Sequence, residues 1–318
     1  MGILIKADES TDVKYGCRPE ERPIREYIRN GVINLDKPPG PTSHQVVAWI
    51  KHILSISKAG HAGTLDPKVS GVLPVALENA VKALYAISKA DKEYVGILKL
   101  HSYVDEEKIR KVMSYFIGDV YQRPPLRSAV KRALRIKRIY NLKVLEVNNR
   151  DVLFHVKCES GTYIRMLCHH IGMLLGVGGH MQELRRITSG PFKEDSSLVT
   201  LHKLKDAYDI WLESGDETFL RRVIQPMERL VENIPKIFVR DSAVDAICNG
   251  ANLYAQGVVR FDSTIKKGNL VALMTLKNEL IALGTALKTS LEIFEMDYGV
   301  VVKTIRVIMN RGTYPKTW

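Results

Sequence analysis

Asp66 occupies the setting in this sequence that best suits a reactive group. It lies in Gly60-His-Ala-Gly-Thr-Leu-Asp-Pro67, a loop punctuated by glycines. The proline disfavours the helical region for the aspartate backbone, so the carboxylate is presented from an extended, constrained turn. An ionised carboxylate held in this way can act as a nucleophile or as a base. Taken alone, the loop favours a plainer interpretation, an aspartate that only shapes a turn.

Cys168-His169-His170 has the composition of a metal site. Adjacent side chains on a helix point in different directions, however, and no further ligand follows four residues later. The cysteines lie far apart and form no C-x-x-C pair, at positions 17, 158, 168 and 248. We therefore expect reduced structural thiols, with no metal and no cofactor.

Length and charge bound the possible functions. The 318 residues are enough for two domains, and 47 Lys and Arg against 35 Asp and Glu give a net charge of +12. Such a charge favours a polyanionic partner such as nucleic acid, although it also serves solubility. No apolar run is long enough to span a membrane, and the first ten residues include Lys6, Asp8 and Glu9. We expect a cytoplasmic protein that does not bind membranes.

Hydrophobic periodicity and turn residues divide the chain into segments. Residues 1–30 are polar and predict an extended or weakly helical lead-in without a core of its own. A mixture of strand pairs and helices without regular βαβ alternation then predicts an α+β catalytic domain at 31–230, with a largely antiparallel mixed sheet. The predicted elements are strands at 31–37, 93–101 and twice within 138–159, and helices at 45–53, 105–116, 163–175 and 201–213. A charged stretch at 214–222 leads into a linker that ends at Pro235.

Short β-like runs follow from residue 235 to residue 318. They lie at 236–240, 270–275, 280–284 and 300–309, with glycines between them. This texture predicts a small β-barrel.

Several motifs resemble those of one enzyme family, the TruB and dyskerin group of pseudouridine synthases. Its catalytic signature is similar to His61-Ala-Gly-Thr-Leu-Asp-Pro67 followed by Gly71-Val-Leu-Pro-Val-Ala76. Three further matches occur in the same order as in the group: Asn34-Leu-Asp-Lys-Pro38 with Thr42-Ser43, Lys92-Glu-Tyr-Val-Gly96, and Ser160-Gly-Thr-Tyr-Ile-Arg165. The last segment resembles a PUA domain, an RNA-binding barrel.

The resemblance implies isomerisation of uridine, in which the C–N glycosidic bond breaks, the base turns, and C5 joins the same sugar carbon. It makes Asp66 the essential carboxylate, which attacks the base, attacks the sugar or removes a sugar proton. A carboxylate shielded from water needs a cation to stay ionised, and the resemblance assigns that role to Arg165. It places Tyr94 against the target uracil, where its hydroxyl could help proton transfer from C5.

The resemblance assigns three supporting residues. His61 would fill the space that the extruded nucleotide leaves. Leu184 would close the pocket from the other side, although an ordinary core leucine fits equally well. Lys37 would support the catalytic loop.

Tyr121-Gln-Arg-Pro-Pro-Leu-Arg-Ser-Ala-Val-Lys-Arg132 resembles the dyskerin branch, which works inside the H/ACA ribonucleoprotein. Residues 123–138 hold seven basic residues and no acidic one, which favours contact with a phosphate backbone over a solvated basic face. The proposed RNA-binding residues of this segment are Arg123, Arg127, Lys131, Arg132 and Arg135. The Lys-rich tails of dyskerin are absent here, which favours an archaeal member without a nuclear address.

The resemblance also implies partners. They are a guide RNA, the substrate RNA, a small zinc-ribbon protein of the Nop family, a Gar-type protein and a kink-turn-binding ribosomal-type protein. The substrate would be rRNA, with tRNA as a further substrate. Two alternatives stay open: a guide-independent tRNA pseudouridine synthase, and a non-catalytic scaffold of the ribonucleoprotein.

Overall fold

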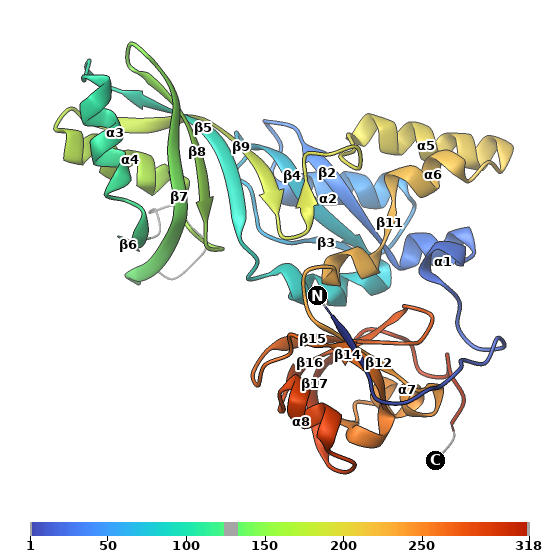
Figure 1. The fold of residues 1–318 in the computed structure, drawn as a ribbon. Helices are drawn as coiled ribbons and strands as arrows, with labels where there is room; N and C mark the ends of the chain where they lie inside the picture. The colour runs from blue at the N-terminus through green and yellow to red at the C-terminus, as the bar shows by residue number, and fades with distance from the viewer. Residues whose placement is uncertain (1, 124–132, 317–318) are drawn as a thin grey trace.

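The computed structural model describes residues 2–123 and 133–316, and over these residues the chain forms two separate sheets (Figure 1). The larger sheet has ten strands in the order β11-β2-β4-β9-β5-β8-β7-β6, with β10 attached to β9 and β3 attached to β4. Its strand pairings are antiparallel except that of β4 with β9. The predicted α+β class with a largely antiparallel mixed sheet is confirmed.

The larger sheet and its helices extend from residue 19 to residue 231. Its strands are β2 (Gly31–Lys37), β3 (Ala59–His61), β4 (Ser70–Leu77), β5 (Lys92–Leu100), β6 (Gly118–Gln122), β7 (Arg135–Asn148), β8 (Asp151–Cys158), β9 (Gly179–Ser189), β10 (Phe192–Lys193) and β11 (Gln225–Pro226). Its helices are α1 (Ile24–Arg29), α2 (Ser43–Ile53), α3 (Glu106–Ser114), α4 (Ile164–Leu175), α5 (Leu201–Ser214) and α6 (Thr218–Val223), with 3₁₀ turns at Pro19–Glu21 (η1), Glu78–Ile87 (η2) and Met227–Val231 (η3). No helix within the described ranges is long and apolar enough to cross a bilayer.

Local sequence explains the elements that were predicted. The Thr42 side chain and Gln45 form a reciprocal capping box at the start of α2, which satisfies amide groups that a helix start leaves unpaired. Strand β5 alternates buried and half-buried residues along its whole length, as a strand with one covered face does. Strands β7 and β8 form a hairpin whose turn places Asn149 at φ 55°, a conformation that asparagine tolerates. The corresponding predictions are confirmed.

Strands β4 and β9 were not predicted, although both lie at the centre of the sheet. Strand β4 contains Pro74, which has no amide hydrogen to give to a neighbour. On one edge β4 pairs with β9 only at Ser70 and Gly71, and with β3 from Val75 onward. Pro74 falls between these two short pairings and its carbonyl accepts from Ala62 (3.2 Å). The gap explains why proline is tolerated there.

The second sheet confirms the prediction of a small β domain after residue 235. Its order is β1-β14-β12-β15-β16-β17-β13, and Figure 1 shows it strongly curled below the larger sheet. The strands are β1 (Ile3–Ile5), β12 (Lys236–Val239), β13 (Leu253–Tyr254), β14 (Val258–Asp262), β15 (Leu270–Met274), β16 (Leu280–Ala286) and β17 (Val300–Val307), with helices α7 (Asp241–Cys248) and α8 (Ser290–Glu295) and the turn η4 (Ala255–Gly257).

Residues 2–30 form a strap that packs on both domains. Strand β1 extends the small sheet by pairing with β14. The Lys6 ammonium donates to three carbonyls around the end of α8, those of Ile293 (2.9 Å), Phe294 (3.0 Å) and Met296 (2.5 Å), which is a favourable position for a cation. Helix α1 buries its apolar side chains in the core of the larger domain. This segment is therefore integral to both domains.

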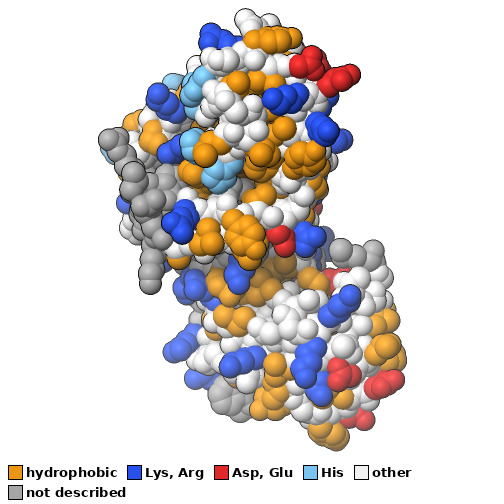
Figure 2. All heavy atoms as spheres, turned by 90° about the vertical axis from the view of Figure 1, so that its left-hand side faces the viewer, with side chains coloured by type: hydrophobic (Ala, Val, Ile, Leu, Met, Phe, Trp, Pro, Cys, Tyr) orange, Lys and Arg blue, Asp and Glu red, His pale blue; other side chains and the backbone are white. Residues whose placement is uncertain are grey.

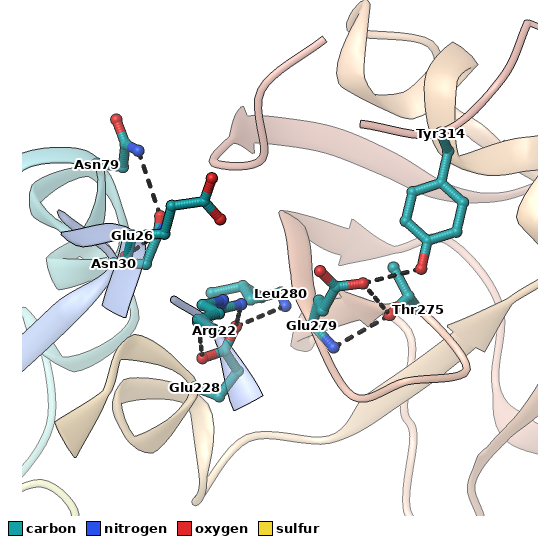
Figure 3. A network of polar contacts seen from close by, with 9 residues as sticks. All are labelled: Arg22, Glu26, Asn30, Asn79, Glu228, Thr275, Glu279, Leu280 and Tyr314. Atoms are coloured by element: carbon teal, nitrogen blue, oxygen red, sulfur yellow. Dashed lines mark hydrogen bonds and ion pairs between the residues drawn. The ribbon is translucent and has the colours of Figure 1, made fainter. Parts of the chain in front are cut away.

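The predicted linker, which follows the charged stretch at 214–222 and ends at Pro235, is wrong, because most of it is packed. Its buried side chains join an apolar cluster that also contains residues of the small sheet. Beside this cluster, Arg22 and Glu228 form a buried ion pair (2.7 Å) in which the two side chains are only 6% and 12% exposed. Glu228 also accepts from the backbone amide of Leu280 in β16 (3.0 Å), and Figure 3 shows the resulting bridge from strap to small sheet. The two domains are thus joined by a hydrophobic and ionic interface.

Replacing Arg22 tests this interface. Arg22→Met leaves the Glu228 carboxylate buried without its cation, so we expect a loss of about 3 kcal/mol in unfolding free energy, measured by urea denaturation. The matched control is Arg110→Met, which removes an exposed arginine paired with Glu106 and is expected to cost less than about 1 kcal/mol. Equal effects of the two variants would contradict the role given to the buried pair.

Candidate active site

The loop that carries Asp66 is fixed from beneath by two buried side chains. The Lys37 ammonium, at the end of β2, donates to the carbonyls of Pro38 (2.9 Å), Pro67 (3.0 Å) and Val69 (2.9 Å). The Ser43 hydroxyl, in the first turn of α2, donates to the Leu65 carbonyl (3.1 Å) and accepts from the Leu65 amide (2.9 Å). Since these bonds bracket Asp66 on both sides, its backbone has little freedom.

The Asp66 carboxylate forms an ion pair with the Arg165 guanidinium. The two residues lie 99 positions apart in the chain, and Arg165 belongs to the first turn of α4. Their side chains are 48% and 47% exposed, so the expectation of a carboxylate shielded from water is wrong for the free protein. An exposed pair contributes little to stability, and its main effect is to orient the carboxylate.

Gln122 holds the start of α4 in place. Its buried side chain accepts from the amide of Tyr163 (2.9 Å) and donates to the carbonyl of the same residue (3.2 Å). Tyr163 is the N-cap of α4, two residues before Arg165. The position of the arginine therefore depends on the end of β6.

Asp66 and Arg165 lie at a cavity of about 440 Å³, a size typical of small-molecule sites. Tyr94 and Leu184 line the same cavity, on the neighbouring strands β5 and β9. Burial raises the pKa of the Tyr94 hydroxyl, which the nearby Arg186 partly opposes. The structure thus places Asp66, Arg165, Tyr94 and Leu184 around one space.

Two buried cations that the sequence analysis did not single out line this cavity as well. Lys92 is 3% exposed and Arg186 is 1% exposed. Arg186 donates from Nε to the Val72 carbonyl (2.7 Å) and from Nη2 to the Gly63 carbonyl (3.0 Å). The signal that could have revealed them is their spacing: Lys92 and Tyr94 share one face of a strand, as do Leu184 and Arg186.

Gly71 allows the close approach of β4 to β9 at this point. It has φ +100°, and a Cβ atom there would lie 2.2 Å from the carbonyl oxygen of Arg186. Only glycine fits both the backbone conformation and the space. The glycine at the start of Gly71-Val-Leu-Pro-Val-Ala76 is therefore required by the close contact between β4 and β9.

His61 lies next to the cavity but not on its lining. Its ring packs edge-on against His44, with ring centroids 5.2 Å apart. Its buried Nδ1 has no hydrogen-bond partner among the described residues. Burial, followed by the charges of His44 and Arg186, lowers the pKa of His61 to about 4. The imidazole is therefore neutral near pH 7, and its role at an extruded nucleotide stays a prediction.

The basic segment is described only at its two ends. Arg123 is exposed just after β6, and Arg135 begins β7 opposite Gln122. Arg127, Lys131 and Arg132 lie outside the described residues. RNA contact by this segment stays a prediction.

The cavity combines the Asp66 carboxylate, the Arg165 guanidinium and the Tyr94 phenol with the apolar side chain of Leu184. Such a set can carry out nucleophilic or acid–base chemistry on a flat, neutral ligand. Within the described part of the chain, no three His, Cys, Asp or Glu side chains gather as metal ligands.

Known proteins match this chain over nearly all of its length. Residues 51–107 and 98–164 match the N-terminal domain of TruB family pseudouridylate synthases, and residues 165–232 match the C-terminal domain of tRNA pseudouridylate synthase B. Residues 235–308 match a PUA domain and residues 2–47 match a DKCLD domain.

Similar proteins cover almost the whole chain. A probable tRNA pseudouridine synthase B of Methanopyrus kandleri is 58% identical over 99% of this chain and 93% of its own. Its counterpart in Pyrococcus abyssi is 57% identical, over 99% and 95%.

The chain belongs to the TruB family of pseudouridine synthases. A solved structure described as the archaeal box H/ACA sRNP Nop10-Cbf5 complex contains a chain that is 54% identical, with a TM-score of 0.92, over 100% of this chain and 98% of that one. An H/ACA RNP bound to a substrate RNA containing 2′-deoxyuridine gives a TM-score of 0.93 at 54% identity, over 100% and 97%. The assignment to an RNA pseudouridine synthase of the archaeal dyskerin type is thereby confirmed.

The neutral state of His61 predicts a dependence of stability on pH. Because its pKa falls to about 4 in the folded protein, from about 6.5 when unfolded, the unfolded chain binds more protons between these values. Stability is full above pH 6.5 and falls as the pH drops towards 4, with a loss of roughly 1–2 kcal/mol between pH 7 and pH 5. Urea denaturation at both pH values should show that His61→Gln removes this part of the slope. The exposed His202 provides the control, His202→Gln, and an unchanged slope in His61→Gln would refute the assignment.

Proposed function

We propose that this protein is the catalytic subunit of an H/ACA guide-RNA ribonucleoprotein, which isomerises selected uridines of rRNA, and of tRNA as a second substrate. The observation that carries the proposal is the full-length likeness to a chain of an H/ACA RNP bound to substrate RNA, at a TM-score of 0.93. The cavity with Asp66, Arg165 and Tyr94 supports it chemically.

We propose a task in the reaction for each residue at the cavity. Asp66 supplies the carboxylate that attacks the base, attacks the sugar or removes a sugar proton. Arg165 orients it and keeps it ionised when the RNA covers the pair and excludes water. Tyr94, whose hydroxyl stays protonated, packs against the uracil and can take part in the proton transfer at C5. Leu184 confines the base during its rotation.

The partners proposed here rest on the names of similar complexes and on surface composition. A solved complex described as Cbf5-Nop10-Gar1 contains a chain 57% identical to this one, with a TM-score of 0.93 over 99% of this chain. We propose that this chain binds a small zinc-ribbon protein of the Nop family and a Gar-type protein. We further propose that it binds a guide RNA and a kink-turn-binding ribosomal-type protein. Exposed apolar side chains near α3 and α4 offer a surface for a protein partner: Tyr103, Tyr115, Met173 and Leu174.

The RNA would lie along one basic face of the molecule. Figure 2 shows Lys and Arg side chains above and below the narrow region between the two domains, with few acidic side chains among them. This arrangement suits a phosphate backbone that runs from the small domain to the catalytic cavity. Arg123, Arg127, Lys131, Arg132 and Arg135 would extend that surface beside the cavity. We propose that the protein acts in the cytoplasm of an archaeal cell. The organisms of the similar proteins support the archaeal part of this proposal.

A second candidate function is guide-independent modification of tRNA. It is favoured by the curated relatives, which are called probable tRNA pseudouridine synthases, and it uses the same cavity. The scaffold alternative is disfavoured, because a scaffold has no need for a carboxylate, an arginine and a tyrosine around one space.

Pseudouridine formation in radiolabelled RNA tests the proposal. We expect product in a guide-matched rRNA fragment only when guide RNA and partner proteins are present, and a loss of at least about 10³-fold with Asp66→Asn. Asp36→Asn changes a carboxylate that pairs with Arg185 outside the cavity and serves as the matched control. Product in tRNA without a guide would support the second candidate. Absence of product in every RNA would contradict both enzymatic functions.

A further inference from the structure

The floor of the catalytic cavity holds two positive charges that have no carboxylate partner. Lys92 and Arg186 line the cavity and are almost completely buried. The Lys92 ammonium donates to the carbonyls of Ala90 (2.5 Å) and Ile87 (3.4 Å), and the Arg186 guanidinium also donates to carbonyls. Across the described residues, neither side chain takes part in an ion pair. A buried cation is costly unless an anion approaches it.

Strand register places both cations beside Tyr94 and under the catalytic loop. Tyr94 lies opposite Arg186 in the pairing of β5 with β9, and Lys92 shares the face of Tyr94. Gly63, in the loop before Asp66, covers them: a Cβ atom on it would lie 3.2 Å from Nη1 of Arg186 and 3.4 Å from Cε of Lys92. The two charges thus lie between Tyr94 and the loop.

The charges of the cavity do not cancel. Asp66 and Arg165 neutralise each other, whereas Lys92 and Arg186 leave an excess of two positive charges in a place with little water. Burial and the proximity of Arg186 lower the pKa of Lys92 to about 8, which is the direction expected of a cation in a positive potential. A neutral uridine gains little from this potential, whereas an anionic ligand would gain much.

The reaction produces such an anion. When the C1′–N1 bond breaks, its electron pair leaves with uracil and spreads over N1, O2 and O4, while C1′ bonds to the Asp66 carboxylate or becomes a cation that loses a sugar proton. When Asp66 instead attacks C6, the charge also moves onto the base. C5 then bonds to C1′. This breaks the bond between Asp66 and C1′ on the first route, and on the second route the removed proton returns to the sugar as C1′ bonds to C5. On the third route the C1′–N1 bond breaks and the bond between Asp66 and C6 breaks later. On each route the proton on C5 is lost and N1 takes up a proton, so Asp66 ends as a free carboxylate. On every route the uracil is negative before the new bond forms.

We infer that Lys92 and Arg186 hold the negatively charged uracil inside the cavity after it leaves the sugar. This inference rests on the pseudouridine synthase function above. The two cations stabilise the transition state and the detached base, and they contribute little to the binding of the uridine itself.

Lys92→Met tests the inference, with Lys92→Arg as the variant that keeps the charge. Single-turnover pseudouridine formation should fall roughly 10²-fold in Lys92→Met, while the affinity for substrate RNA stays within about twofold. Lys92→Arg should retain most of the rate. The exposed neighbour Lys89 gives the control, Lys89→Met, which should leave the rate unchanged.

The pH profile separates a charge effect from a packing effect. The groups that face Lys92 are Tyr94 on β5, Arg186 on β9, Cys158 on β8 and Asp91 in the preceding turn. Burial raises the pKa of Cys158 to about 12 and also raises that of Tyr94, so Lys92 is the group expected to lose its proton near pH 8. The wild-type rate should therefore decline above pH 8, and Lys92→Arg should move that decline to higher pH.

The outcomes distinguish the inference from the function on which it rests. If the wild type forms no pseudouridine in any RNA, the proposed function fails. If the wild type is active and Lys92→Met keeps its rate, the inference is overturned. It is also overturned if both Lys92 variants lose the same activity and retain the wild-type pH profile, since packing would then be the cause.

Discussion

The ion pair between Asp66 and Arg165 is the contact on which the arrangement of the site depends. Neither residue is held by burial, because both side chains are about half exposed. Their positions come instead from buried polar groups behind them. Lys37 and Ser43 bind the backbone on either side of Asp66, and Gln122 binds the residue that begins the helix of Arg165. Buried hydrogen bonds from Lys37, Ser43 and Gln122 thus hold an exposed ion pair in position.

The charged side chains of the site lie in two places. Asp66 and Arg165 lie at the exposed opening of the cavity, called its mouth, and Lys92 and Arg186 lie buried at its floor. At the mouth, the Asp66 and Arg165 charges cancel and remain hydrated, which leaves the carboxylate available to a ligand. At the floor, Lys92 and Arg186 are buried, donate to backbone carbonyls and have no carboxylate partner among the described residues. This division suits a reaction that begins with a neutral nucleoside and passes through an anionic base. Away from this cavity, the Arg22–Glu228 pair and the hydrogen bond from the Leu280 amide to Glu228 join the strap to the small domain.

Sequence predicted the class, the enzyme family and Asp66, Arg165, Tyr94 and Leu184 among the residues that the structure gathers at the cavity. Short ordered motifs, such as the loop around Asp66, carry chemistry that needs particular residue types. The exposure of Asp66 was missed, because accessibility depends on what packs above a loop. Arg186 and Lys92 share strand faces with Leu184 and Tyr94, and they were missed because charged side chains are rarely buried. Strand β1 and the packed segment near Glu228 were missed because their partners lie more than 200 residues away in sequence.

The most direct test of this account is the single-turnover rate of pseudouridine formation in Arg165→Met and Arg165→Lys, measured beside the affinity for substrate RNA. If Arg165 orients the carboxylate and keeps it ionised, Arg165→Met should lose roughly 10²-fold or more in rate with RNA affinity almost unchanged. Arg165→Lys should recover part of the rate, because the charge returns without the planar fork. A rate in Arg165→Met equal to that of the wild type would contradict the account.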